Sequence, residues 1–263
     1  MVLVTGDCHG NFARFEQKHF SEQANMTKDD TVIIAGDFGG VWFGDSRDDE
    51  TLDWLERLPF TLAFVCGNHE NYDALERYPV DEWHGGRVHR IRPHVLHLMR
   101  GQIFELEGCR FFTMGGAKSH DIEDGILEPD APDFERRLMM LQRKPRARYR
   151  VNHISWWARE LPDDEEYAEA RRNLDAVGWQ VTTSLPTAPP PASPSWAAAT
   201  TRRIGSRISC RRCRKEQNIT TGCGSRSCGS SEAGQSRGKH GDTAVLFSAL
   251  SVDQAHHAGK EKL

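Results

Sequence analysis

The first 180 residues predict an α/β fold, because short apolar runs alternate with helix-like segments along this part of the chain. Three of the runs are rich in β-branched residues and are followed by Gly, which is typical of strands buried on both faces of a sheet. These runs are Val2–Thr5, Thr31–Ala35 and Thr61–Cys66, and helix-like segments lie around Phe12 to Phe20 and Thr51 to Leu58. A strand, a helix and a strand at a spacing of about 30 residues indicate βαβ units and a parallel sheet.

The later part of this region predicts a β-hairpin and two helices. Residues 102–108 and 110–114 have the pattern of two strands joined by a tight turn at Glu107-Gly108. The periodicity of apolar residues predicts helices over 133–144 and 163–177. The second of these helices begins with acidic residues, which stabilise the positive N-terminal end of a helix.

A break in composition near residue 180 divides the chain into two regions. Residues 1–180 carry a net charge of −11 and residues 181–263 one of +7, and 21 of the 23 aromatic residues belong to the first region. The second region is rich in Pro, Arg, Ser and Cys, and it has too few large apolar residues to build a core. We therefore interpret residues 1–180 as one folded domain and residues 181–263 as a low-complexity tail that is aberrant or disordered.

The composition also predicts the compartment. No window approaches 18 consecutive apolar residues, the length that a transmembrane helix needs, so no membrane partner is expected. The N-terminus enters a strand-like run without the basic and long apolar segments of a secretory signal. The 7 cysteines form an odd number without disulfide-framework spacing in the first region, which fits a reducing compartment. We expect a cytoplasmic protein.

Polar side chains follow each of the three predicted parallel strands. The strands end in Gly6-Asp7-Cys8-His9-Gly10, Gly36-Asp37-Phe38-Gly39-Gly40 and Gly67-Asn68-His69-Glu70. Ligands collect beyond the carboxyl ends of the strands in an open parallel sheet, so we expect the three clusters to meet there. Asp7 and Asp37 would repel each other in a shared volume, and a divalent cation between them relieves that repulsion. Mixed oxygen and imidazole ligands suit Mn, Fe or Zn better than Ca.

These motifs resemble those of a known enzyme family. The order Gly-Asp-x-His-Gly, Gly-Asp and Gly-Asn-His-Glu, each at a strand end, is similar to the first three motifs of the calcineurin-like metallophosphoesterases. The resemblance covers residues 1–180 and implies a layered β-sandwich flanked by helices. It also implies two divalent metal ions, which would be Mn, Fe or Zn. Asp7 and His9 would bind the first ion, Asp37 would bridge both ions, and Asn68 would bind the second.

The same resemblance implies hydrolysis of a phosphoester by a hydroxide that the two metal ions activate. His69 would protonate the leaving oxygen, and Glu70 would orient His69. Phe38-Gly39-Gly40 follows Asp37 where the Ser/Thr protein phosphatase branch has Arg-Gly, so a small phosphomonoester or phosphodiester is expected as substrate rather than a phosphoprotein. Nucleic acid is not expected as a partner. The candidates for binding phosphate are four arginines in the His-rich stretch 83–101: Arg87, Arg90, Arg92 and Arg100.

The family pattern is incomplete after residue 180. The family has a further strand ending in a ligand histidine and then a Gly-His-x-His loop, and neither motif follows Trp179-Gln180-Val181. One hypothesis is a change of reading frame, because codons for Thr182 to Pro190 read one base earlier permit Asp-Tyr-Ile-Thr-Thr-His-Cys-Ala-Pro. That reading contains a strand ending in the missing histidine. Under this hypothesis, residues from 182 onward are translated out of frame and form no native part of the fold.

Two other interpretations belong to different classes of protein. The chain would be a catalytically inactive remnant if the later histidines are absent, because the second metal site then keeps only Asp37 and Asn68. The tail would instead be a zinc-held module that binds nucleic acid, since Cys210-Arg-Arg-Cys213 precedes Cys223 and Cys228 among arginines. The spacing of the second cysteine pair and the absence of aromatic residues around these cysteines favour a disordered or out-of-frame tail over this module.

Overall fold

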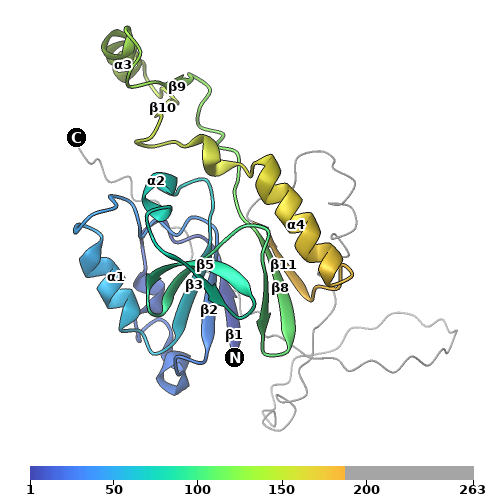
Figure 1. Ribbon diagram of the computed structural model, residues 1–263. Coiled ribbons are helices and arrows are strands. Elements are labelled where there is room, and N and C mark those ends of the chain that lie inside the picture. The colour runs from blue at the N-terminus through green and yellow to red at the C-terminus, as the bar shows by residue number, and fades with distance from the viewer. Residues whose placement is uncertain (187–263) are drawn as a thin grey trace, which may run out of the picture.

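Two β-sheets that pack face to face form the centre of residues 1–186, the part of the chain that the computed structural model describes (Figure 1). The larger sheet has the strand order β1-β2-β3-β6-β5-β4. Its strands are β1 (Val2–Thr5), β2 (Thr31–Ala35), β3 (Thr61–Val65), β4 (Val80–Trp83), β5 (Gly86–Arg92) and β6 (Val95–Leu98). β1, β2, β3 and β6 run parallel, and β5 and β4 extend the sheet in antiparallel pairs. The predicted parallel sheet is confirmed.

The smaller sheet contains β11 (Thr183–Pro186), β8 (Cys109–Met114) and β7 (Ile103–Leu106), in that order. β7 and β8 are antiparallel and form the predicted hairpin. Glu107 and Gly108 at its turn have φ of 51° and 73°. Two consecutive left-handed residues match the twist of hairpin strands, so the turn occurs at the predicted dipeptide.

Three apolar layers hold the sheets and helices together. The layer between the sheets contains side chains from both: Ile33, Ala63, Leu96, Phe104 and Phe111. The layer between the larger sheet and α1 (Asp49–Glu56) contains Leu52, Leu55, Leu62 and Phe64. The layer between the smaller sheet and α4 (Asp164–Ala176) contains Phe112, Met114, Ala170 and Leu174. The α/β class is confirmed, and the order helix, sheet, sheet, helix is the expected layered sandwich (Figure 1).

The helix predicted around Phe12 to Phe20 is wrong, because this segment forms only the 3₁₀ turn Ala13–Phe15. The Gln23 side chain donates 2.8 Å hydrogen bonds to the carbonyls of Phe15 and Phe20, groups that a continuous helix would pair within itself. The Phe15 side chain is fully buried. Side-chain hydrogen bonds and core packing therefore override the helical periodicity of this segment. The remaining 3₁₀ turns are Ser21–Asn25 and Ala158–Glu160.

The two later helices form where the sequence predicts them. α4 begins with a capping box, in which the Asp163 side chain accepts from the Glu166 N–H (2.8 Å) and the Glu166 side chain accepts from the Asp163 N–H (3.0 Å). The other predicted helix, α3 (Phe134–Arg143), lies in an arm with β9 (Ile126–Leu127) and β10 (Arg150–Val151) that projects from the sheets (Figure 1). The short helix α2 (Tyr72–Leu75) follows β3. None of these described helices has both the length and the apolar character that crossing a membrane requires.

The fold continues past residue 180, where the composition predicts that the tail begins. β11 pairs in parallel with β8, with Pro186 opposite Met114, and Leu185 is buried between the two sheets. The expectation that residues from 182 onward form no part of the fold is therefore wrong for Thr183–Pro186. The remaining tail, 187–263, which includes the candidate zinc cysteines, lies outside the described residues.

A pair of buried histidines in the larger sheet makes stability depend on pH. His89 and His97 are paired across β5 and β6, with their Nδ1 atoms 2.9 Å apart. Burial lowers the pKa of both imidazoles, and that of His97 falls well below its usual value. The unfolded chain therefore binds protons that the folded chain does not, so the pair's contribution is complete above pH about 6.5 and is lost as the pH falls below it.

We expect the free energy of unfolding of the wild-type protein to decrease as the pH is lowered from about 6.5 to about 4.5. The His97→Phe variant keeps an aromatic ring against Phe64, whose ring centroid lies 5.0 Å from that of His97, but it does not titrate. Its stability should change less over the same range. Urea unfolding at a series of pH values measures both curves, and equal slopes for the two proteins would contradict the prediction.

Candidate metal centre

Asp37 joins three loops at the carboxyl ends of β1, β2 and β3. The backbone N–H groups of Cys8 and His9 donate to the Asp37 carbonyl, over 3.0 and 2.7 Å. The backbone N–H of His69 donates to Asp37 Oδ1 over 2.9 Å. One residue therefore connects the loop after β2 to the loops after β1 and β3, and the three strand-end clusters meet as the sequence predicts.

Carboxylate and imidazole atoms from these loops converge on one small volume. His9 Nε2 lies 3.5 Å from Asp37 Oδ2 and 4.0 Å from Asp7 Oδ2. One ligand atom each from His9, Asp37 and His69 lie within 4.8 Å of one another. Ligand atoms about 2 Å from a divalent ion lie up to about 4 Å apart, so this arrangement fits an ion after small side-chain movements. Carboxylate and imidazole donors are also those that first-row transition metals bind.

The backbone is strained at two of these residues. His9 and Asp37 have φ of 48° and 40°, in the left-handed region that residues other than glycine rarely adopt. Such strain costs about 1–3 kcal/mol per residue and persists where the surrounding structure fixes the conformation. Here the hydrogen bonds between the loops fix it. The strain falls on two of the residues that the sequence nominates as ligands, which supports a functional reason for their geometry.

Gly67 provides the space that the Asp37 carboxylate occupies. A Cβ at residue 67 would lie 1.9 Å from Asp37 Oδ1 and 2.5 Å from the Asp37 backbone nitrogen. The carboxylate and the backbone of the third loop therefore approach more closely than any other residue type would allow.

Asn68 reaches this edge of the sheet with a partner that sequence reasoning missed. Its Nδ2 donates to Ser119 Oγ over 3.2 Å, and Ser119 in turn bonds to the buried Glu160 carboxylate. Ser119 belongs to the polar run that follows β8, and polar residues after a predicted strand are a signal that points to it. Glu160 lies in the 3₁₀ turn Ala158–Glu160, and no local pattern distinguishes it from a surface residue.

Glu70 has a different role from the expected one. Its carboxylate accepts hydrogen bonds from the backbone N–H groups of Phe38 (2.7 Å) and Gly39 (3.2 Å), so it orients the loop after Asp37 rather than the His69 imidazole. Burial raises the pKa of the Glu70 carboxyl to about 8, although the N–H donors favour its ionised form.

The four arginines nominated for phosphate binding are all engaged in ion pairs. These pairs join Arg87 to Glu169, Arg90 to Asp81, Arg92 to Asp49 and Asp53, and Arg100 to Glu166. The Arg100 side chain is only 2% exposed, so it cannot receive a substrate. The structure therefore does not support this part of the sequence interpretation.

Arg150 on β10 acts on the site and was not nominated from the sequence. It forms an ion pair with Asp121. Burial, the largest influence, lowers the pKa of His69, and the Arg150 charge lowers it further, while Asp37 and Asp121 raise it. The net shift of the His69 pKa is downward. The arm thus brings a positive charge close to the predicted proton donor.

Comparison with known proteins identifies the family. A sequence model of the calcineurin-like phosphoesterases matches residues 1–185, which include every member of the ligand cluster. The chain belongs to the calcineurin-like phosphoesterase family. Proteins of this family typically bind two divalent metal ions and hydrolyse phosphoesters.

The chain is also similar to curated members of this superfamily. Lariat debranching enzyme A of Xenopus laevis is 27% identical over 143 residues, which are 48% of this chain and 26% of the relative. The lariat debranching enzymes of Danio rerio and Homo sapiens are each 24% identical over 148 residues, or 48% of this chain and 24% and 25% of the relatives. The matched segment thus spans about a quarter of the length of these calcineurin-like phosphoesterase relatives. No solved structure matches the chain.

The close approach of Gly67 to Asp37 predicts that Gly67→Ala disrupts the centre. The added Cβ overlaps the carboxylate and the backbone of Asp37, so binding of Mn²⁺, measured by calorimetry on the full chain, should weaken by about 100-fold or more. The matched control is Gly6→Ala, because a Cβ at Gly6 meets nothing within 4 Å. Equal Mn²⁺ affinity in the two variants would contradict the assignment of Asp37 to the metal site.

Proposed function

We propose that the protein is a metal-dependent phosphoesterase that hydrolyses a small phosphomonoester or phosphodiester. The observation that carries the proposal is the convergence of Asp7, His9, Asp37 and His69 at the ends of three parallel strands. Carboxylate and imidazole side chains gathered in this way are the donor set that first-row divalent ions bind.

The proposed ligands divide between two ions. Asp7 and His9 would hold the first ion, Asp37 would be a ligand of both ions, and Asn68 would hold the second. Mn, Fe or Zn suits this mixture of oxygen and nitrogen donors. When bound, two such ions supply a nucleophile at neutral pH and neutralise charge on the phosphoryl oxygens.

The chain's own side chains then complete the reaction. His69 holds the proton that passes to the leaving oxygen, and its ring lies 5.2 Å from that of His9, between centroids, inside the cluster that it forms with His9 and Asp37. Arg150 binds a phosphoryl oxygen, because it is an arginine whose charge acts on His69, and its ion pair with Asp121 opens to receive the substrate. In the absence of substrate, Asp121 neutralises Arg150 through their ion pair.

The substrate class follows from the loop after β2 and from the relatives. Phe38-Gly39-Gly40 in this loop favours a small phosphoester over a phosphoprotein. The matched relatives are named for lariat debranching, which favours testing phosphodiesters beside phosphomonoesters. We place the reaction in the cytoplasm, because Cys8 and Cys66 of the described region are buried free thiols, which suits a reducing compartment.

The reading-frame hypothesis concerns the ligands that would complete both metal sites. β11 ends at Pro186, and the reading shifted by one base permits a histidine at position 187, the next residue in the sequence. We propose that a frame-restored chain contains the missing ligand and that the chain as it stands is impaired. Sequencing the genomic segment tests the hypothesis directly, because the shifted frame must contain a histidine codon there and a later Gly-His-x-His.

The test of function is hydrolysis of an aryl phosphomonoester and a bis-aryl phosphodiester by the purified chain with Mn²⁺, beside the frame-restored chain. The frame-restored chain should hydrolyse at least one substrate, and the present chain should be at least about tenfold slower. The His69→Ala variant should lose about 10²- to 10⁴-fold in kcat. Equal activity of the two chains would refute the impairment, and inactivity of both would refute the phosphoesterase proposal in favour of a remnant.

The role proposed for Arg150 is tested by Arg150→Ala in the frame-restored chain. Loss of a charge-assisted hydrogen bond to phosphate, about 1.5–3 kcal/mol, should raise KM by about tenfold or more. The matched control is Arg87→Ala, which removes an arginine paired with Glu169 on α4. Steady-state kinetics with the better substrate measure both variants, and an unchanged KM in Arg150→Ala would rule out phosphate binding by this side chain.

A further inference from the structure

A buried carboxylate fixes the side chain that bonds to Asn68. Glu160 is 2% exposed, and both of its carboxylate oxygens accept hydrogen bonds from Ser119. The Ser119 N–H donates to Glu160 Oε1 over 2.9 Å, and Ser119 Oγ donates to Oε2 over 2.5 Å. The single hydroxyl proton of Ser119 is therefore committed to Glu160.

This commitment determines which way the Asn68 carboxamide faces. Ser119 Oγ uses its single proton in the hydrogen bond to Glu160, so toward Asn68 it can only accept. Only the NH₂ group of an amide donates a hydrogen bond. Asn68 Nδ2 accordingly lies 3.2 Å from Ser119 Oγ. The amide oxygen is left on the other side of the carboxamide, and the oxygen is the atom that can bind a cation.

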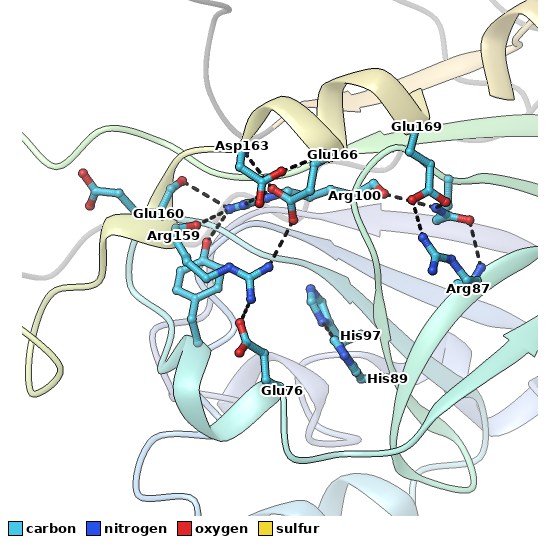
Figure 2. Close-up of polar contacts among 12 residues, drawn as sticks. Glu76, Arg87, His89, His97, Arg100, Arg159, Glu160, Asp163, Glu166 and Glu169 are labelled. Carbon is cyan, nitrogen blue, oxygen red and sulfur yellow. Dashed lines mark hydrogen bonds and ion pairs between the residues drawn. The ribbon is translucent and has the colours of Figure 1, made fainter. Parts of the chain in front are cut away.

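Arg100 holds both the backbone and the partner of Asn68. Figure 2 shows its guanidinium between the Glu166 carboxylate of α4 and the turn that carries Arg159 and Glu160. Arg100 Nη2 donates to the carbonyls of Arg159 (2.8 Å) and Glu160 (3.2 Å). It also lies 2.8 Å from the Tyr72 hydroxyl, which donates to the Gly67 carbonyl over 2.6 Å. One guanidinium thus fixes the turn behind Ser119 and the residue before Asn68.

Gly116 allows this assembly to close. A Cβ at residue 116 would lie 2.4 Å from the Glu160 carbonyl oxygen and 2.7 Å from Arg100 Nη2. The backbone N–H of Gly116 donates to the Cys66 carbonyl at the end of β3, over 2.8 Å. The loop carrying Ser119 is therefore fastened both to β3 and to the Arg100 cluster.

We infer that Glu160 is a positioning residue that, through Ser119, presents the Asn68 amide oxygen to the second metal ion. The inference rests on the proposed metal site and deepens it. Groups that orient a metal ligand typically contribute about 10- to 100-fold to metal affinity. Without Glu160, the Ser119 hydroxyl can donate to Asn68, and the carboxamide can turn its NH₂ group toward the ion.

The Glu160→Gln variant tests this polarity while keeping the size of the side chain. Gln accepts from the Ser119 N–H with its oxygen and donates to Ser119 Oγ with its nitrogen, which releases the hydroxyl proton toward Asn68. Ser119→Ala removes the partner altogether. The matched control is Thr61→Val, which removes a buried hydroxyl bonded to the Lys28 carbonyl (2.6 Å) at the opposite end of β3.

The first measurement is made on the metal-free full chain. Side-chain amide NMR resonances of Asn68, assigned by their loss in Asn68→Asp, should shift in Glu160→Gln and in Ser119→Ala and stay unchanged in Thr61→Val. Asn68 resonances identical to those of the wild type in both Glu160→Gln and Ser119→Ala would overturn the inference. This readout requires no bound metal and no activity.

The second measurement is a titration of the frame-restored chain and its variants with Zn²⁺ alone, followed separately at His9 and at Asn68. In Glu160→Gln and in Ser119→Ala, the midpoint of the titration at Asn68 should move to about 10- to 100-fold higher Zn²⁺ concentration, and the midpoint at His9 should move less than about threefold. Equal shifts of the Zn²⁺ midpoint at both residues would mean general destabilisation. This result would overturn the positioning role of Glu160 but not the metal site. If Zn²⁺ shifts neither residue in the wild type, the metal site itself is wrong and the inference falls with it.

Discussion

The hydrogen bonds of Asp37 are the interactions on which the rest of the site depends. The backbone carbonyl of Asp37 accepts from two N–H groups of the first loop, and its side-chain Oδ1 accepts from the third loop, so the three loops share one residue. This sharing explains two local features that are unfavourable by themselves. The positive φ of Asp37 is maintained because hydrogen bonds from both sides hold it, and Gly67 is required because the carboxylate fills the space of a side chain there.

The sequence predicts those parts of the fold and the site whose cause is local. The three parallel strands are continuous apolar runs rich in β-branched residues. Such a run is enough to predict a strand that is buried on both faces of a parallel sheet. Asp7, Asp37 and His69 are recognisable because polar residues directly follow such strands. The segment from Phe12 to Phe20 differs, since its periodicity fits a helix but the carbonyls of Phe15 and Phe20 accept hydrogen bonds from the Gln23 side chain just beyond the segment.

The residues that the sequence missed are those whose role arises only from the tertiary fold. Glu160 and Arg150 occupy segments without a strand-end pattern, and they reach the site because the chain returns to it after the hairpin of β7 and β8. The opposite error has the same cause. Arg87 and Arg100 lie in a basic stretch that invites a phosphate-binding interpretation, but α4 supplies the carboxylates of Glu169 and Glu166 that bind them (Figure 2). The charge pattern of one segment does not show which oppositely charged side chains from another segment pair with it in the fold.

The parallel pairing of β11 with β8 gives the reading-frame hypothesis a structural meaning. Pro186 lies opposite Met114, so both strands end at the same edge of the smaller sheet, and the loop after β8 carries Ser119 toward Asn68. The end of β11 therefore lies beside the start of the loop that contacts Asn68. The reading-frame hypothesis needs a ligand soon after β11, and the pairing of β11 with β8 is consistent with that requirement, because parallel neighbours end at the same edge of their sheet.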